Sequence, residues 1–475
     1  SGKFGGDTDN WIWPRHTGDF SMFRVYASKD NRPAAYSPQN VPYRPKKHFS
    51  ISTKGVKEGD FTMIYGFPGN TQEYILSDAV AYIAERSDPA KIAIRTGRLD
   101  IITKAQESDP ALRIHYAAKH ASIANAWKKW QGEALGIDRR GTVAAKFDYE
   151  TQFGLWSVGR PEYAGVVMGL RAEYDRIMDA YFAYEITRET LSTLPAAYTP
   201  EERAEECFAR RKSAEQALWR HAFREYGRCP KVYRTPSYAE GMARYKSPEA
   251  YADALFEAVW EGSDSVAMQP AVRLREETKR MLDHISWMLG TKSLRNLNSK
   301  ILNELYTTYI KGLREWDRER AFYPDANLTL RVAYGSVAGY EYADGEYHKP
   351  QTTLDGIIAK DNPEIYDYDI PQSLRDLYAS KNYGRWGTVI DGRRTVPVCF
   401  LATNHTTGGN SGSPVLNAGG ELIGINFDRT WRSTMSDIAF DPAICRNIAV
   451  DIRYVLFVVD RVGGAGYLLK EMTLK

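Results

Sequence analysis

The sequence predicts a β + α multidomain protein in which a β domain is interrupted by a large inserted all-helical domain. Three observations predict this architecture. The two ends of the chain have strand-like patterns, the segment between them has helical periodicity, and 475 residues are too many for one compact core. We therefore expect three parts: a β segment over 1–75, a helical domain over 76–325 and the rest of the β domain over 326–475.

The strand-like patterns lie at both ends of the chain. Phe61–Tyr65 is a short apolar run before Gly66–Asn70, a turn rich in Gly and Pro. After Asn327 apolar and polar residues alternate, which places one set on a single side of a predicted strand: Leu328, Leu330, Val332 and Tyr334. The end of the chain again contains short apolar runs, so the β domain resumes there.

The segment 76–325 predicts amphipathic helices. Its apolar residues recur at spacings of three and four, as in Tyr174, Ile177, Met178, Tyr181 and Phe182. Prolines are expected to interrupt the helices at four places: Pro195, Pro200, Pro230 and Pro236. We interpret the aromatic stripes as core packing without a chemical role.

Composition and charge argue against several classes of function. A formal net charge of +3 on this length argues against nucleic acid as the main partner. No apolar run reaches the roughly 18 residues of a membrane span. The cysteines form no C-x-x-C pair and lie at no zinc spacing from histidines, so we expect no metal or other cofactor. Two disulfides and four buried thiols are both compatible with the four positions: Cys207, Cys229, Cys399 and Cys445.

The strongest chemical signal is the segment Thr407–Val415, which reads TGGNSGSPV. Its glycines allow a tight turn that would expose the hydroxyl of Ser411 as a nucleophile. The backbone amides of Gly409 and Ser411 could then stabilise one oxyanion, a contact worth about 3–4 kcal/mol in other enzymes. A polar surface turn is the alternative for such a composition. Apolar runs on both sides, Val398–Ala402 and Leu422–Ile425, favour a nucleophile loop between two strands.

This loop resembles the G-[DN]-S-G-[GS]-P motif of chymotrypsin-fold serine peptidases, with Ser411 at the nucleophile position. His16–Val25 resembles the aspartate strand of that fold, with Asp19 as the triad carboxylate. Gly55–Gly69 is similar to the end of the first barrel. The resemblance implies a chymotrypsin-like double β-barrel with an incomplete first barrel. The triad order in this fold is His, Asp, Ser, and Asp19 precedes Ser411 as expected.

No histidine of the sequence matches the triad position. Only His16 precedes Asp19, at a distance of three residues, and His405 lies six residues before Ser411, where this fold lines its specificity pocket. The chain also begins without Met and without a signal-peptide pattern. We therefore expect the general base in a segment that precedes this chain. The alternative is a homologue that binds peptides without cutting them.

The two motifs around a helical insertion are similar to those of the bacterial dipeptidyl-peptidase 7 and 11 family, and the similarity covers the whole chain. Three further segments carry it: Asn10–Asp19, which reads NWIWPRHTGD, Ser122–Trp130 and Asn447–Leu456. The resemblance implies a serine exopeptidase that holds the free N-terminus of a peptide and releases a dipeptide through an acyl-enzyme. It also implies a homodimer in the periplasm or at the cell surface.

The resemblance also implies the residues that bind the substrate N-terminus. Asn10, Trp11 and Asn125 match the anchors of the substrate ammonium, and Asp428 is expected to add negative charge there. Arg15 is either a further substrate contact or a salt-bridge partner that steadies the aspartate strand.

Arg429 is predicted to select the residue before the scissile bond. It ends the run Leu422–Arg429, and a guanidinium at this position can bind a carboxylate through two hydrogen bonds. In the family, an arginine here accompanies a preference for Asp or Glu, whereas a glycine accompanies hydrophobic preference. We therefore expect an enzyme closest to the acidic-preferring members. An endopeptidase with the same acidic preference is the alternative.

Overall fold

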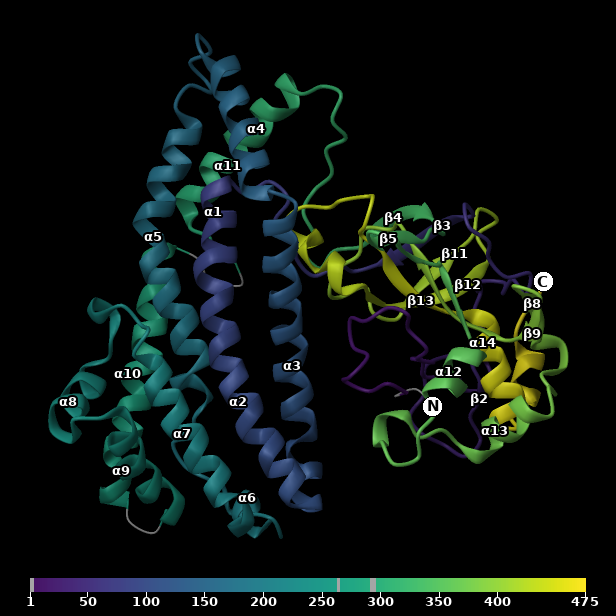
Figure 1. The fold of residues 1–475 in the computed structure, drawn as a ribbon, viewed down its shortest axis with the longest axis horizontal. Helices are drawn as coiled ribbons and strands as arrows, with labels where there is room; N and C mark the ends of the chain where they lie inside the picture. Colours follow the sequence, from purple (N-terminus) through teal and green to yellow (C-terminus); the bar gives the residue numbers. More distant parts are fainter. Residues whose placement is uncertain (1–3, 263–264, 291–295) are drawn as a thin grey trace. The chain divides into compact units, whose positions relative to one another are not determined.

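The computed structural model describes residues 4–262, 265–290 and 296–475. The chain divides into two compact units, residues 1–73 together with 325–475, and residues 74–324 (Figure 1). The first unit holds the main sheet and the second is helical, so the predicted β fold with a large helical insertion is confirmed. The sequence places the boundaries at 75/76 and 325/326, and the structure separates the units at 73/74 and 324/325.

An antiparallel seven-stranded sheet with the order β4-β3-β11-β12-β13-β10-β7 is the framework of the first unit. Its strands are β3 (Phe61–Gly66), β4 (Arg331–Ser336), β7 (Gln351–Thr353), β10 (Pro397–Ala402), β11 (Ser413–Leu416), β12 (Leu422–Arg429) and β13 (Asn447–Asp451). β3 pairs with β4 and with β11. The segment that resembles the end of a first barrel therefore belongs to the same sheet as the strand after the nucleophile.

Short paired strands and helices surround this sheet. The pairs are β1 (Tyr26–Ala27) with β2 (Val41–Pro42), β5 (Tyr340–Ala343) with β6 (Glu346–His348), and β8 (Thr388–Ile390) with β9 (Arg393–Thr395). The helices are α12 (Leu354–Lys360), α13 (Gln372–Ala379) and α14 (Ile452–Phe457). A 3-10 helix, η7 (Trp431–Asp437), follows β12 directly.

Residues of β10 and β13 alternate between two apolar cores. Cys399 and Val450 are paired in register and belong to one core, while their neighbours Phe400 and Ala449 are paired and belong to the other. All residues of β10 are buried, as the continuous apolar run predicts. A shift of one residue would exchange the two cores, so packing fixes the register of the strand that leads into the nucleophile loop.

The second unit is built from α1 (Ser77–Ala81), α2 (Asp88–Ser108), α3 (Pro110–Arg139), α4 (Thr142–Ser157), α5 (Val166–Glu189), α6 (Pro200–Ala204), α7 (Lys212–Tyr226), α8 (Pro236–Tyr245), α9 (Pro248–Glu261), α10 (Ser265–Leu289) and α11 (Lys300–Trp316). The π-helix η1 (Tyr82–Ser87) joins α1 to α2. The predicted stripe of α5 is part of the core, with Tyr174, Ile177, Tyr181 and Phe182 buried and Met178 partly buried.

Capping residues explain where several of these helices begin. The Asp109 carboxylate accepts a hydrogen bond from the Ala111 amide at the start of α3, and Thr199 forms a reciprocal capping box with Glu202 at α6. Pro200 and Pro236, which the sequence predicts as helix breaks, are the first residues of α6 and α8. Proline suits this position because its missing N–H would have no partner within the helix.

The four cysteines are free and buried, so the structure holds thiols and not disulfides at these positions. Burial raises the pKa of the Cys399 thiol to about 12 and that of Cys229 to about 11. In the described ranges, no helix combines the length and the apolar character that crossing a membrane requires.

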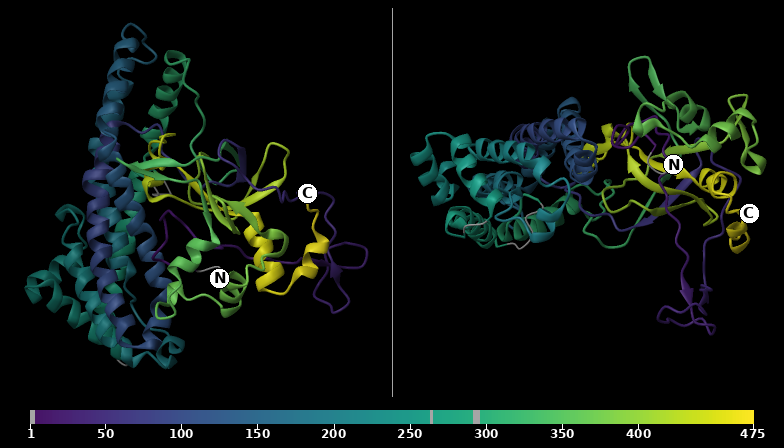
Figure 2. Two further views of the ribbon diagram at one scale, coloured as in Figure 1. Left: turned by 45° about the vertical axis from the view of Figure 1, so that its right-hand side comes forward. Right: turned by 90° about the horizontal axis from the view of Figure 1, so that it is seen from below.

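The segment that contains β1 and β2 forms an extended arm of the first unit, drawn in purple (Figure 2). Large apolar side chains are exposed along it, including Phe23, Val25, Tyr36 and Phe49. The arm therefore contributes little to the apolar cores of this unit.

The core of the helical unit generates a prediction about its stability. Leu170 on α5 is fully buried, whereas Leu155 on α4 is 70% exposed. Leu170→Ala should lower the free energy of unfolding by about 2–5 kcal/mol because it leaves a cavity. Leu155→Ala is the matched control and should change it by less than about 0.5 kcal/mol. Denaturant unfolding followed by far-UV circular dichroism measures both, and equal losses would contradict this assignment of the core.

Candidate active site

Ser411 lies in an exposed loop between β10 and β11, where the sequence places the nucleophile. Its Oγ donates a hydrogen bond to the Phe427 carbonyl of β12 at 3.3 Å. Within the described ranges, no histidine hydrogen bonds to Ser411. His405, the nearest histidine in sequence, contacts the Ser436 carbonyl through its Nε2 at 2.8 Å.

Gly409 gives this loop its sharp turn. Its φ is +105°, a conformation that favours glycine, and a Cβ at this position would overlap the Phe67 carbonyl. The amides of Asn410 and Gly412 donate hydrogen bonds to backbone carbonyls. Among the described residues, by contrast, nothing accepts a hydrogen bond from the amides of Gly409 and Ser411. Two donors next to the nucleophile are what an oxyanion requires.

Phe427 is an extra residue on β12. Asn426 pairs with Ala449, and Asp428 pairs with the next residue of β13, Ile448. Phe427 therefore has no partner residue on β13, which makes it a β-bulge. Such a bulge leaves the extra residue outside the ladder of strand hydrogen bonds. The Phe427 carbonyl is therefore able to accept the hydrogen bond from the nucleophile.

Asp428 joins β12 to the segment before the aspartate strand. Its Oδ2 accepts hydrogen bonds from the Trp11 amide at 3.1 Å and from Arg15 Nη1 at 3.0 Å, and its Oδ1 accepts one from the Arg429 amide at 2.8 Å. Burial raises the pKa of Asp428 above its ordinary value, and the Arg15 guanidinium partly offsets this effect. Of the two roles open to Arg15, the structure contains the salt bridge, with the buried Asp428 as partner.

Trp11 is held by its backbone and lies against a second cation. Its φ is +68°, its amide binds Asp428, and its carbonyl accepts a hydrogen bond from the Trp431 amide at 2.6 Å. The ring centroid is 5.6 Å from the centre of the Arg429 guanidinium. The neighbouring Asn10 is half-buried. The anchor residue and the predicted specificity residue are therefore in direct contact.

Arg429 is 4% exposed, and its guanidinium binds the carboxylate of Asp437, which is not among the predicted site residues. Its Nη1 and Nη2 donate to Asp437 Oδ1 and Oδ2 at 2.6 and 2.8 Å. Nη1 also donates to Ser436 Oγ at 2.9 Å and to the Thr406 carbonyl at 3.2 Å. The sequence offers one signal for Asp437, a carboxylate eight residues after an arginine predicted to bind carboxylates.

Asp19 follows Gly18, which packs so closely on the Tyr454 ring of α14 that a Cβ there would overlap it. Asp19 itself is exposed and has no hydrogen bond to the described residues. Its pKa is raised chiefly because neighbouring atoms displace water from the carboxylate, while the nearby Arg15 lowers it. The structure thus gathers Trp11, Arg15, Asp19, Asp428 and Arg429 in one unit, and Ser411 joins them through Phe427.

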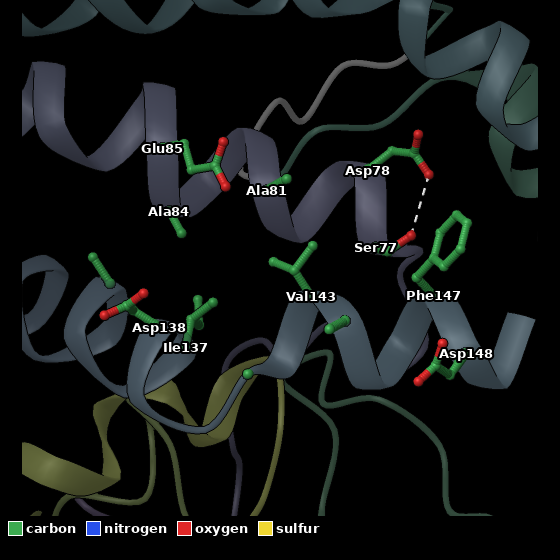
Figure 3. A pocket seen from close by; sticks show the side chains of 13 residues that line it. Ser77, Asp78, Ala81, Ala84, Glu85, Ile137, Asp138, Val143, Phe147 and Asp148 are labelled. Carbon is green, nitrogen blue, oxygen red and sulfur yellow. Dashed lines mark hydrogen bonds between the residues drawn. The ribbon is translucent and has the colours of Figure 1, made fainter.

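Asn125, the remaining predicted anchor, is an exposed residue of α3 in the helical unit. The same unit contains a cavity of about 710 Å³ between α1, η1 and the helices α3 and α4 (Figure 3). Carboxylates line it together with small and apolar side chains: Asp78, Glu85, Asp138, Asp148, Ala81, Val143, Ile137 and Phe147. The predicted site residues are not among its described lining residues.

Three potential metal ligands also meet in the helical unit, where the sequence predicts no metal. The donor atoms of His115, Glu205 and Cys207 lie within 4.8 Å of one another. Arg211 is a buried cation among them, and its Nη1 contacts His115 Nε2 at 2.7 Å and Glu205 Oε2 at 3.1 Å. The Arg211 guanidinium therefore already neutralises the negative charge of Glu205, which a bound metal ion would otherwise neutralise.

Comparison with known proteins places this geometry among peptidases. The Peptidase S46 family model matches residues 1–206 and 188–474. The Asp/Glu-specific dipeptidyl-peptidase of Capnocytophaga gingivalis is 41% identical over 519 aligned residues, which cover 100% of this chain and 71% of that protein. Dipeptidyl-peptidase 7 of Phocaeicola vulgatus is 34% identical over 514 aligned residues, with the same coverage of 100% and 71%.

The fold is also similar to that of a solved peptidase structure. The crystal structure of Porphyromonas endodontalis DPP11 in complex with the dipeptide Arg-Glu matches with a TM-score of 0.83 and 33% sequence identity. The match covers 100% of this chain and 73% of that chain.

His16, next to Arg15, generates a prediction about pH. Its ring is buried, its Nδ1 lacks a hydrogen-bond partner among the described residues, and burial lowers its pKa to about 4, with Lys360 adding to the effect. Below about pH 6.5 the imidazole of His16 takes up a proton in the unfolded chain but stays neutral in the folded protein. The free energy of unfolding therefore falls as the pH decreases, until the pH reaches the pKa of His16 in the folded protein, about 4. His16→Gln removes the titrating group, so the decrease in the free energy of unfolding between about pH 6.5 and pH 4 should become smaller by up to ~3 kcal/mol. Denaturant unfolding at about pH 7 and pH 4.5 measures this, and parallel pH profiles would refute it.

Proposed function

This chain belongs to the peptidase S46 family, and we propose that it is a serine-type exopeptidase that releases dipeptides from peptide N-termini and prefers Asp or Glu as the second residue. One observation carries the specificity. A buried arginine, Arg429, follows the nucleophile loop and contacts Trp11, the predicted anchor residue. Relatives with 41% identity over the whole chain are Asp/Glu-specific dipeptidyl-peptidases.

The chemistry proposed for the site is acyl transfer. Ser411 Oγ attacks the carbonyl carbon of the second substrate residue, and its proton passes to a general base that Asp19 orients. The oxyanion of the tetrahedral intermediate accepts hydrogen bonds from the amides of Gly409 and Ser411. The peptide bond then breaks, the shortened peptide leaves as an amine, and water hydrolyses the acyl-enzyme to release the dipeptide.

The exopeptidase action depends on holding a free ammonium two residues before the scissile bond. We assign this contact to the side chain of Asn10, with Trp11 as a wall of the neighbouring subsite; the family resemblance implies Asn125 as a further anchor. The charge of Asp428 is balanced by Arg15 at 3.0 Å, and the same carboxylate holds the Trp11 amide. We therefore propose that Asp428 supports the anchor chiefly by fixing Trp11.

The specificity depends on the hydrogen bonds that Arg429 can form with the side chain of the second substrate residue. A substrate carboxylate can form two charge-assisted hydrogen bonds with Arg429, and an apolar side chain forms none. We further propose, from the family resemblance, that the protein is a homodimer in the periplasm or at the cell surface. Light scattering on the intact protein tests the first point and cell fractionation the second.

The exopeptidase assignment predicts sensitivity to the substrate N-terminus. Acetylation removes the ammonium, so kcat/KM of the intact protein should fall about ten- to a hundred-fold, the equivalent of one lost charge-assisted contact. Matched reporters with free and acetylated termini measure the ratio, and Ser411→Ala provides the background rate. Equal rates on the two reporters would indicate the acidic-preferring endopeptidase instead.

The specificity assignment predicts a change of ranking on substitution of Arg429. In the intact protein, Arg429→Gly should lose about ten- to a hundred-fold in kcat/KM on Asp and Glu reporters and gain activity on Leu reporters. Arg429→Lys should keep a weakened acidic preference, because an ammonium cannot make the two-pronged contact. Arg385→Ala, which changes an exposed arginine stacked on Trp386, is the control. An unchanged ranking in Arg429→Gly would exclude Arg429 from the specificity pocket.

A further inference from the structure

The guanidinium of Arg429 is already engaged by a carboxylate of the protein itself. Asp437 accepts from both terminal nitrogens at 2.6 and 2.8 Å, and the side chains of the pair are 5% and 12% exposed. The Ser436 hydroxyl and the Thr406 carbonyl accept further hydrogen bonds from Nη1. The two-donor edge formed by Nη1 and Nη2 is therefore occupied by groups of the chain.

Asp437 is also held firmly in place. It ends η7, and its carbonyl accepts a hydrogen bond from the Gln72 amide at 2.6 Å. The preceding Ser436 carbonyl is bound by His405 Nε2 at 2.8 Å, and the His405 ring stacks on Phe440 with centroids 4.6 Å apart. Because hydrogen bonds hold the backbone of both Ser436 and Asp437, the Asp437 carboxylate is fixed beside Arg429.

A substrate carboxylate therefore meets a pair of opposite charges and not an isolated cation. A guanidinium offers one further two-donor edge, formed by Nε and Nη2, and a substrate that uses it shares Arg429 with Asp437. A substrate that takes the occupied edge has to displace Asp437. In both cases a second carboxylate comes close to the first, and the repulsion between them subtracts from the attraction to Arg429.

We propose that Asp437 is a specificity-determining residue: an internal carboxylate that pairs with Arg429 when no acidic side chain is bound and weakens the binding of Asp and Glu side chains. This inference rests on the proposed function of Arg429. Asp437 keeps the buried guanidinium paired between substrates, which avoids the cost of an unpaired buried charge. It also sets the affinity for acidic products below the value that Arg429 alone would give.

The inference predicts a gain of affinity, which structural damage does not produce. Asp437→Asn keeps the shape of the side chain and removes its charge, so the acidic dipeptide Arg-Glu should bind about ten- to a hundred-fold more tightly. The isosteric neutral dipeptide Arg-Gln should bind equally or more weakly, because Arg429 then lacks an ionised partner. Isothermal titration calorimetry on the intact protein measures both affinities without requiring turnover.

Further variants separate this effect from a loss of structure. Asp437→Ser removes the same charge with a smaller side chain that admits water, and it should also tighten Arg-Glu. Asp369→Asn removes an exposed carboxylate paired with Arg375 at 2.8 Å and should leave both affinities unchanged. In an Arg429→Met background, Asp437→Asn should produce no gain, because its effect acts through the arginine.

The outcomes distinguish this inference from the proposed function. If the wild type binds Arg-Glu and Arg-Gln equally, the acidic specificity of Arg429 itself fails. If the wild type prefers Arg-Glu and both Asp437 variants bind it equally or more weakly, only the role of Asp437 is overturned. A gain that persists in the Arg429→Met background would likewise overturn it.

Discussion

Three consecutive residues of β12, Phe427 to Arg429, hold the Ser411 loop, the N-terminal segment and η7 against one strand. The bulge at Phe427 removes one carbonyl from the strand ladder, and this carbonyl accepts the hydrogen bond of Ser411 Oγ. The next two residues carry opposite charges, and each is buried in an ion pair with a residue from another segment. Ser411, Trp11 and Arg429 are therefore all positioned from one short stretch of strand.

The two ion pairs matter more for geometry than for net stability. A buried pair gains little overall because desolvation offsets its attraction, but removing one partner costs about 3–5 kcal/mol. Arg15 with Asp428 therefore ties the N-terminal segment to β12, although the two lie far apart in the sequence. Arg429 with Asp437 ties β12 to η7. Trp11 lies between these pairs, bonded to one through its amide and stacked on the guanidinium of the other.

This arrangement suits an enzyme that has to recognise two features of a substrate at once. The free N-terminus and the acidic side chain belong to adjacent residues of the substrate, so the groups that bind them have to lie close together. The contact between Trp11 and Arg429 provides that proximity within one unit. The predicted anchor Asn125 lies on α3 of the helical unit, which has an apolar core of its own.

Local sequence patterns predict the loop around Ser411, the helical insertion and a specificity role for Arg429. These depend on local patterns: glycines around Ser411, helical spacing in residues such as Tyr174 and Ile177, and an arginine at the end of an apolar run. The folded chain was needed to show that Arg15 pairs with Asp428, that Arg429 pairs with Asp437, and that the cysteines are free thiols. A charged group or a thiol gains its partner only when distant segments pack together. The sequence gives the residue type at each position but not which other segment packs against it.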